Sequence, residues 1–192
     1  SGVVKFVATT PLVDFFQPTS FVFDSTDRLY YLNTQGPSGG AFVNSPIIRL
    51  TFQDDNDYLS SGEYIDIGIP PKDIQQPSAL ALNKDDTILY LGSGDTAAII
   101  YKYVFATKTV KKIYDYIDYS QYDGIINVLA VDGNGNLYFT MENSNTMKTE
   151  LLYFDTSDTL RTVTLSGVSI VTTARGLSFA SAGTLYLTAG NL

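Results

Sequence analysis

Four polar residues occupy the same place in four similar segments of the sequence. Thr19, Ser78, Asn127 and Arg175 each come just before a short apolar stretch. If the segments are arranged around an axis, these side chains ring one end of a central channel, as a polar mouth with one positive charge. Such a mouth could contact a carboxylate or a sugar. The alternative for Arg175 is that its guanidinium satisfies backbone carbonyls at the start of a strand.

Two groups of acidic and amide residues could hold a cation. Asp132, Asn134 and Asn136 alternate as the first oxygen ligands of a calcium loop do. They lack the glycine and the bidentate glutamate that should follow, and they lie between two apolar segments, so a hairpin turn is favoured and calcium is the alternative. The cluster Asp54–Asp57 is predicted to be a solvated loop, with a weak surface calcium site as its alternative. Asp85–Asp86 is predicted to be a turn.

The composition excludes several classes of function. The chain has 192 residues with no His and no Cys, so Ser-His-Asp and Cys-His nucleophiles, thiolate zinc sites and disulfides are excluded. A net charge of −8 argues against nucleic acid, which requires clustered cations. The sequence contains no run of 18 apolar residues, so no membrane span is predicted. The acidic residues fall mostly in predicted turns, so no carboxylate pair suits glycoside hydrolysis. We therefore predict no enzyme activity, no cofactor and no metal.

The elements that position these residues repeat along the chain. Each unit has a short apolar strand, a turn, and a second strand that opens with Leu-Tyr, and the second residues of these pairs are Tyr30, Tyr90, Tyr138 and Tyr186. The spacings are 60, 48 and 48 residues, as read from the numbering. A period near 48 residues with four strands a unit is typical of β-propeller blades.

Third and fourth strands complete three of the units. A doubled aliphatic pair begins each predicted third strand, and fourth strands are expected shortly after them. The third strands are predicted at 47–50, 99–102 and 151–154, and the fourth strands at 64–67, 110–114 and 160–165.

The fourth unit is predicted to be built from both ends of the chain. Only two of its strands precede Leu192, and 3–6 repeats the doubled aliphatic pattern of a third strand, with 12–16 as the fourth. If the ends are joined, Tyr186 precedes Val3 by 9 positions, as Tyr90 precedes Ile99. We therefore predict an all-β, four-bladed propeller in one domain. Its predicted blades are 18–70, 76–118, 126–168, and 174–192 plus 1–16.

The shared fourth blade leaves three ways of closing the ring. The termini could pair within one chain, they could complete the half blade of a neighbouring copy in a head-to-tail polymer, or the chain could be one segment of a tandem array. Bare strand edges aggregate, so an unpaired half blade is disfavoured. The predicted partners are therefore the chain itself or adjacent domains, with a glycan as a further possibility and no nucleic acid.

The repeated Pro-x-x-apolar-x-apolar-Asp, turn, Leu-Tyr units resemble NHL and gluconolactonase-like β-propeller repeats. The resemblance covers most of the chain and implies the fold. It also implies a divalent ion held by Glu, Asn and Asp at the inner ends of strands. The matching positions here are the four residues of the mouth, with no Glu among them.

A cluster of tyrosines lies on the connection into the third unit. It comprises Tyr114, Tyr116, Tyr119 and Tyr122. Tyrosine gives a large contact area at low entropic cost, so the cluster could be an interface patch. Packing over the end of the channel is the alternative.

Three functions follow, in order of preference. The first is a non-enzymatic, extracellular or surface-associated structural or adhesive module, and possible repeating subunit of a fibre, since Tyr, Thr, Ser and Asn are typical of secreted surfaces. The second is a module that binds a small ligand or glycan at the mouth. The third is a metal-dependent enzyme like the lactonases.

Overall fold

The computed structural model describes residues 18–33, 47–53, 58–68, 77–93, 98–116, 124–143, 148–164, 174–180 and 183–189. All regular secondary structure in these ranges is β-strand, which confirms the all-β prediction. Within the same ranges, no helix is long and apolar enough to cross a membrane.

The strands form four consecutive antiparallel sheets, each built by neighbours in the sequence. Sheet 1 contains β1 (Pro18–Phe23), β2 (Leu29–Asn33), β3 (Ile47–Gln53) and β4 (Tyr58–Tyr64). Sheet 2 contains β5 (Pro77–Leu82), β6 (Ile88–Ser93), β7 (Ile99–Val104) and β8 (Thr109–Asp115). Sheet 3 contains β9 (Gly124–Val131), β10 (Leu137–Asn143), β11 (Lys148–Phe154) and β12 (Leu160–Thr162). Sheet 4 contains β13 (Ala174–Phe179) and β14 (Leu185–Ala189).

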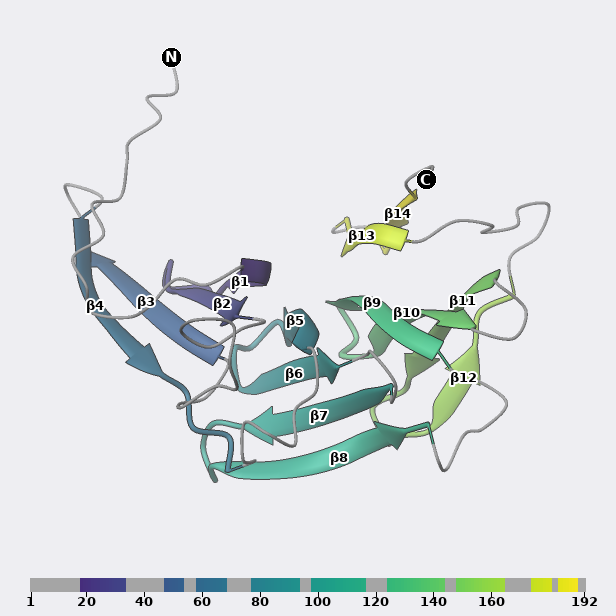
Figure 1. Ribbon diagram of the computed structural model, residues 1–192, viewed down its shortest axis with the longest axis horizontal. Helices are drawn as coiled ribbons and strands as arrows, with labels where there is room; N and C mark the ends of the chain where they lie inside the picture. Colours follow the sequence, from purple (N-terminus) through teal and green to yellow (C-terminus); the bar gives the residue numbers. More distant parts are fainter. Residues whose placement is uncertain are drawn as a thin grey trace, which may run out of the picture.

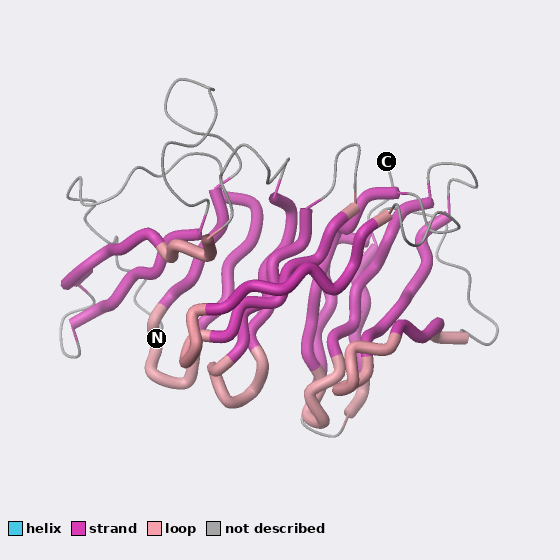
Figure 2. The backbone as a smooth tube through the Cα atoms, turned by 90° about the horizontal axis from the view of Figure 1, so that it is seen from below, coloured by secondary structure: helices cyan, strands magenta, loops and turns pink. Residues whose placement is uncertain are grey.

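The four sheets follow one another along an arc with their first strands on the inside (Figure 1). β1 packs beside β5, β5 beside β9 and β9 beside β13. The last strands of the first three sheets, β4, β8 and β12, lie on the outside of the arc. Seen from below, the described part consists of these sheets standing side by side (Figure 2).

The described part is an open arc. β1 and β13 lie at its two ends and are not packed together as the other neighbouring inner strands are. The N-terminal strands predicted at 3–6 and 12–16 lie outside the described residues. The four-bladed ring with a fourth blade shared between the termini therefore stays a prediction.

The turns between the strands explain why each hairpin forms where it does. In the turn between β9 and β10, the N–H of Gly135 donates to the carbonyl of Asp132 at 3.1 Å, and Gly135 has φ 89°. The same bond joins Asp86 to Asn83 and Gly183 to Ala180, again with positive φ at the donor. Glycine and aspartate tolerate this conformation, so the sequence fixes a tight hairpin.

Apolar side chains fill the junctions between successive sheets. Tyr30, Leu32 and Ile47 of sheet 1 pack with Leu80 and Leu91 of sheet 2. A second core joins sheets 2 and 3. It includes Tyr90, Ile100 and Tyr114 from sheet 2, and Leu129, Phe139 and Phe154 from sheet 3. Alternation along each strand sends successive residues to opposite faces, so each sheet serves two junctions.

Tyr114 is a core residue, so the predicted tyrosine interface patch is wrong for this member. It is 1% exposed, and its ring meets Phe139 edge-to-face with centroids 5.5 Å apart. Tyr116 packs at the edge of the same core. Tyr119 and Tyr122 lie outside the described residues.

Two of the fourth strands differ from their predicted bounds. β4 ends at Tyr64, where the prediction began, and Ile65 and Ile67 beyond it pack into the core between sheets 1 and 2. β12 ends at Thr162 rather than at 165. β8 spans the predicted 110–114 with one more residue at each end.

Candidate functional site

Each of the four predicted mouth residues is the extra residue of a β-bulge in an inner strand. In β5, Pro77 pairs with Ser93 and Ala79 with Gly92, so Ser78 has no partner in the register. The same shift leaves Thr19, Asn127 and Arg175 unpaired in β1, β9 and β13. A bulge re-aims one side chain and is common beside functional sites. The arc brings the four bulges onto adjacent inner strands.

Two of the four side chains tie one sheet to the next. The hydroxyl of Thr19 donates to the backbone carbonyl of Pro77 at 3.3 Å. The hydroxyl of Ser78 donates to the carbonyl of Ile126 at 2.6 Å and also lies 3.3 Å from that of Gly92. Pro77 and Ile126 each stand just before the bulge of the following strand, so the two bonds are equivalent. These two hydroxyls therefore have a structural role, because they hold neighbouring sheets together.

Asn127 breaks this pattern. The equivalent acceptor would be the carbonyl of Ala174, yet the buried Nδ2 of Asn127 has no hydrogen-bond partner. Thr140 pairs with Val128, the residue after the bulge, and its Oγ1 is also buried and unpartnered, with the residue 0% exposed. A buried polar group without a partner costs about 1–3 kcal/mol, so each of these two side chains would gain from a further hydrogen-bond partner.

Arg175 is the equivalent bulge residue on β13. It is exposed on β13, beside β9, and makes no hydrogen bond or ion pair with the described residues. Two other arginines are paired, Arg28 with Asp24 at 2.6 Å and Arg161 with Asp155 at 3.4 Å. The strand next to β9 therefore carries a guanidinium that has no hydrogen-bond or ion-pair partner among the described residues, while β9 and β10 carry an amide donor and a hydroxyl without partners.

Thr140 was missed by the sequence analysis. The signal lay in the register: the residue that pairs just after each bulge is Leu32, Gly92, Thr140 and Thr188 in turn. A threonine at a position that faces a sheet junction stands out only after the bulges are placed.

The metal implied by the family resemblance does not fit these residues. A hard divalent cation needs several oxygen ligands, with carboxylates among them. The bulges offer two hydroxyls that already serve as donors, an amide and a cationic guanidinium. Elsewhere in the described ranges, no group of three or more Asp, Glu, His or Cys side chains could hold a metal ion.

The candidate calcium loop is a hairpin turn. Oδ1 of Asp132 accepts from the backbone N–H groups of Asn134 at 2.9 Å and Asn136 at 2.8 Å, and Oδ2 accepts from the Asn136 side chain at 2.8 Å. Asn83 accepts from two backbone N–H groups in the same way in sheet 2. The oxygens are thus engaged within the turn. The other cluster, Asp54–Asp57, lies outside the described residues.

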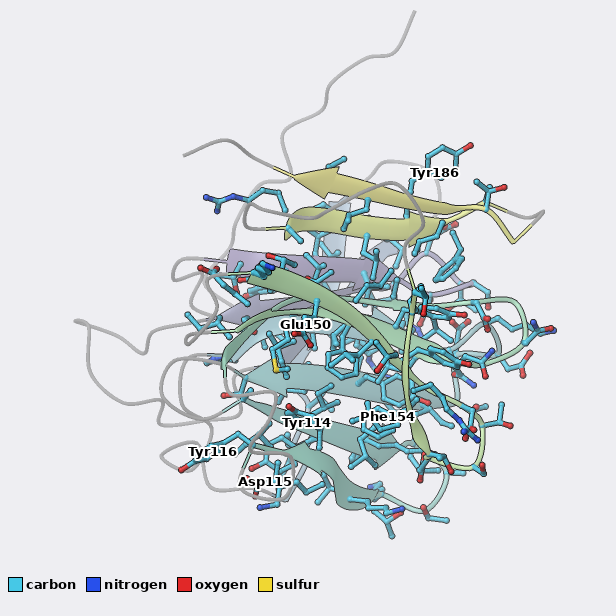
Figure 3. All side chains as sticks on the ribbon, turned by 90° about the vertical axis from the view of Figure 1, so that its right-hand side faces the viewer. Tyr114, Asp115, Tyr116, Glu150, Phe154 and Tyr186 are labelled. Carbon is cyan, nitrogen blue, oxygen red and sulfur yellow. The ribbon has the colours of Figure 1, made fainter. Side chains whose placement is uncertain are left out.

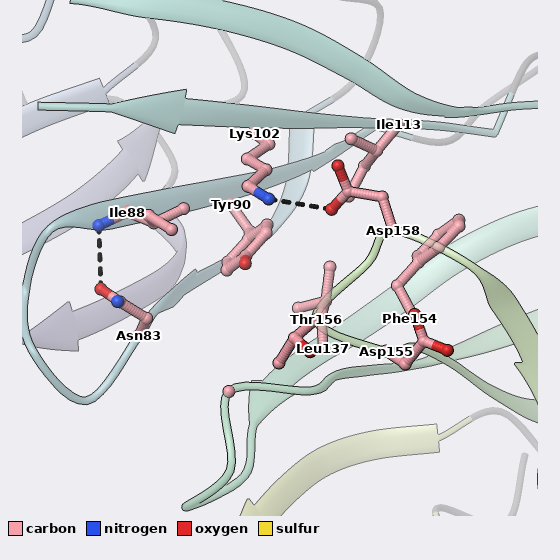
Figure 4. A pocket seen from close by; sticks show the side chains of 11 residues that line it. Asn83, Ile88, Tyr90, Lys102, Ile113, Leu137, Phe154, Asp155, Thr156 and Asp158 are labelled. Carbon is pink, nitrogen blue, oxygen red and sulfur yellow. Dashed lines mark hydrogen bonds and ion pairs between the residues drawn. The ribbon is translucent and has the colours of Figure 1, made fainter. Parts of the chain in front are cut away.

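A separate pocket of about 180 Å³ lies between sheets 2 and 3 (Figure 4). Lys102 and Asp158 form an ion pair of 2.8 Å beside it, and Lys111 also bonds to Asp158 at 2.9 Å. Burial raises the pKa of Asp158, but the bonds from the two lysines outweigh it and the pKa lies below its ordinary value. Burial, with the negative charge of Asp158, raises the pKa of Tyr90 to about 12. The pocket contains none of the predicted mouth residues.

No family model and no curated protein matches the sequence. Solved structures do match it. A gluconolactonase from Xanthomonas campestris is 16% identical with a TM-score of 0.59, over 90% of this chain and 54% of its own. The chain thus has the fold of part of a β-propeller. The resemblance expected from the repeat is thus confirmed at the level of fold.

Two further matches carry other functions on the same architecture. Hydrazine synthase from Kuenenia stuttgartiensis is 13% identical with a TM-score of 0.56, over 95% of this chain and 44% of its own. The extracellular domain of a putative hybrid two-component system from Bacteroides thetaiotaomicron is 16% identical with a TM-score of 0.56, over 90% of this chain and 20% of its own. The chain spans about half the length of the gluconolactonase and less of the other two.

The prediction from the composition that the chain is not an enzyme is wrong. A structure that matches 90% of the chain is that of a gluconolactonase, so a protein with this fold can be an enzyme. The absence of His and Cys excluded particular nucleophiles, whereas the prediction extended that exclusion to all catalysis. The adhesive and fibre-forming roles and the extracellular location stay predictions.

Proposed function

We propose that the junction of sheets 3 and 4 is the ligand site of a propeller sector and takes a sugar-derived lactone or its ring-opened carboxylate. The observation that carries the proposal is the buried, unpartnered Nδ2 of Asn127, on the strand beside the uncommitted Arg175. Its two structural equivalents, Thr19 and Ser78, are both engaged with the next sheet.

The chemistry of the junction favours an acceptor-rich ligand. A guanidinium presents paired N–H donors that match a carboxylate, and such charge-assisted bonds are among the strongest in proteins. The Asn127 amide adds a donor for a hydroxyl or carbonyl oxygen, and the Thr140 hydroxyl can donate or accept. A cationic or purely apolar ligand would leave these donors without partners.

The same donors suit a lactone carbonyl. When water adds to the carbonyl carbon, negative charge grows on its oxygen, and fixed N–H donors lower the free energy of that state. The ring C–O bond then breaks, one proton of the added water passes to the ring oxygen, and the other is released to solvent as the product carboxylate forms. Gluconolactone is the natural first probe, because the matching Xanthomonas protein is a gluconolactonase.

Calorimetry with gluconate tests the binding step. We expect Arg175→Ala to weaken binding about 10-fold or more, since a hydrogen bond to a charged group contributes about 1.5–3 kcal/mol. Asn127→Asp keeps the shape but replaces the N–H donor with a negative oxygen, so it should weaken binding similarly. Arg161→Ala is the matched control, because it removes an arginine from the outer strand β12.

Equal affinity of the wild type and Arg175→Ala would overturn the proposal, as would a loss of binding in Arg161→Ala. Ring opening of gluconolactone, followed by proton release above the spontaneous rate, tests the chemical step separately. Binding that responds to Arg175 without accelerated ring opening would restrict the site to recognition.

A further inference from the structure

The three internal junctions between sheets are built from equivalent residues. The Tyr of each Leu-Tyr pair faces the following sheet: Tyr30 packs with leucines of sheet 2, and Tyr90 lies in the core with sheet 3. Tyr138 meets Phe179 of sheet 4, with ring centroids 4.8 Å apart. Each junction thus joins a tyrosine from one sheet to an apolar row on the first two strands of the next.

On the first sheet, the β1 residues of this row are exposed, whereas Tyr31 of β2 is only 3% exposed. Phe21 pairs with Tyr31 and Phe23 with Leu29, as Leu80 pairs with Leu91 in sheet 2. Leu80 is 4% exposed in its junction, whereas Phe21 is 69% and Phe23 54% exposed. The phenylalanines therefore stand where a preceding sheet would pack.

The last sheet exposes the complementary tyrosine. Tyr186 follows Leu185 as Tyr138 follows Leu137, but it is 59% exposed and points away from the neighbouring sheets (Figure 3). Phe21, Phe23 and Tyr186 are the large apolar side chains that are exposed in the described ranges. The two ends of the arc thus present the two halves of the junction that the chain already uses three times.

We propose that these two faces dock head to tail between two copies of this chain, closing one ring. Both halves of the junction are present on each copy, so a second copy satisfies both ends at once. The match also covers 54% of the gluconolactonase chain, so two copies of this chain have about the length of that protein. With four sheets in each copy, the ring has eight, which is within the range known for propellers.

This docking is distinct from completion of sheet 4 by further strands. An added strand would pair with the edge of β14 that has no partner strand in the described part of the chain, and would extend the sheet. The face that carries Tyr186 would still lack a partner. A two-fold axis relates the two junctions of the proposed ring, so a single substitution at either end alters both of them.

Sedimentation equilibrium over a concentration series tests the proposal. We expect a mass of two copies of the 21.0 kDa chain for the wild type. Phe21→Asp and Tyr186→Asp should each give single copies, because a charge would be buried in the docked face. Ala106→Asp places the same charge on an exposed turn of sheet 2 and should leave the two-copy mass unchanged.

An equimolar mixture of the two end variants gives the sharpest outcome. The intact Tyr186 of one variant can meet the intact Phe21 of the other, so one junction should reform and restore a two-copy species. A two-copy mass that persists in either variant alone would overturn the head-to-tail arrangement. Single copies of the wild type at every concentration would overturn docking itself, and unlimited polymers would overturn ring closure. Unchanged circular dichroism of the variants confirms that they are folded.

Discussion

The hydroxyl of Ser78 donates a 2.6 Å hydrogen bond to the backbone carbonyl of Ile126, across the boundary between sheets 2 and 3. Thr19 makes the same bond one sheet earlier, to Pro77. A repeated bulge thus first serves to fasten neighbouring sheets. At the next boundary Asn127 leaves its donor unused, and this departure from the repeat distinguishes a candidate site from a structural tie.

Gly92 and Ile126 form a tight contact that a matched pair of substitutions can test. A Cβ on Gly92 would lie 3.0 Å from Cγ2 of Ile126. Gly92→Thr should therefore destabilise the fold by about 1–3 kcal/mol through overpacking. The equivalent positions at the following boundary hold Thr140 and Ala174.

Adding Ile126→Ala to Gly92→Thr copies that natural pair. We expect the double variant to recover part of the lost stability, measured by urea denaturation, because the removed side chain leaves room for the threonine. The cycle needs Ile126→Ala alone as its control. Additive losses from the two substitutions would show that the contact is not the source of the strain.

Replacing Asp132 tests the assignment of its loop as a turn. Asp132→Ala removes the acceptor for two backbone N–H groups and should cost about 1–3 kcal/mol. Asp132→Asn should cost less, because Asn83 fills the same role in sheet 2. Thermal unfolding with and without calcium provides the check. A calcium-dependent rise in Tm that disappears in Asp132→Asn would contradict the assignment.

Tyr90 should make the fold sensitive to alkaline pH. Its pKa is raised from 10.0 to about 12 in the folded protein, so its contribution to stability is complete below pH 10 and is lost as the pH rises toward 12. At 1.36 kcal/mol per pH unit, the loss reaches about 3 kcal/mol.

We therefore expect Tyr90→Phe to lose less stability than the wild type between pH 10 and 12, by urea denaturation. Burial also raises the pKa of Tyr30 and Tyr138, so part of the alkaline loss should persist. If the free energy of unfolding fell equally with pH in the wild type and in Tyr90→Phe, Tyr90 would ionise equally in the folded and unfolded states.

Asp158 should contribute to stability in the opposite pH direction. Its folded pKa lies below the ordinary 3.8, because Lys102 and Lys111 bond to the charged form more strongly than burial opposes it. The contribution is present above pH 4 and is lost as the pH falls through the folded pKa. Asp158→Asn should cost about 1 kcal/mol at pH 7 and less at pH 3, whereas the exposed Asp85→Asn should change neither value. An equal loss of stability in Asp158→Asn at pH 7 and at pH 3 would contradict this role of Asp158.

The repeat in the sequence predicted the hairpins well, because turn residues and strand alternation act locally. The Leu-Tyr pairs open β2, β10 and β14 as expected, and the turn at Gly135 has the predicted positive φ. The sequence also placed Thr19, Ser78, Asn127 and Arg175 at equivalent positions, which the register identifies as bulges.

The division of roles among those residues could not be predicted, because it depends on contacts between sheets. Ser78 and Asn127 are equally polar in the sequence. Only the packing of β5 against β9, and of β9 against β13, shows that Ser78 is bonded and that Asn127 Nδ2 is not. Tyr114 was misjudged for the same reason, since a tyrosine near the end of a strand reveals its burial only when the next sheet is in place.

A crystal structure of the protein grown with gluconate tests the central claim most directly. We expect the carboxylate of gluconate against the guanidinium of Arg175 and a ligand oxygen within hydrogen-bond distance of Asn127 Nδ2. Gluconate bound elsewhere, with Asn127 Nδ2 donating to the carbonyl of Ala174 as Ser78 does to that of Ile126, would contradict the account.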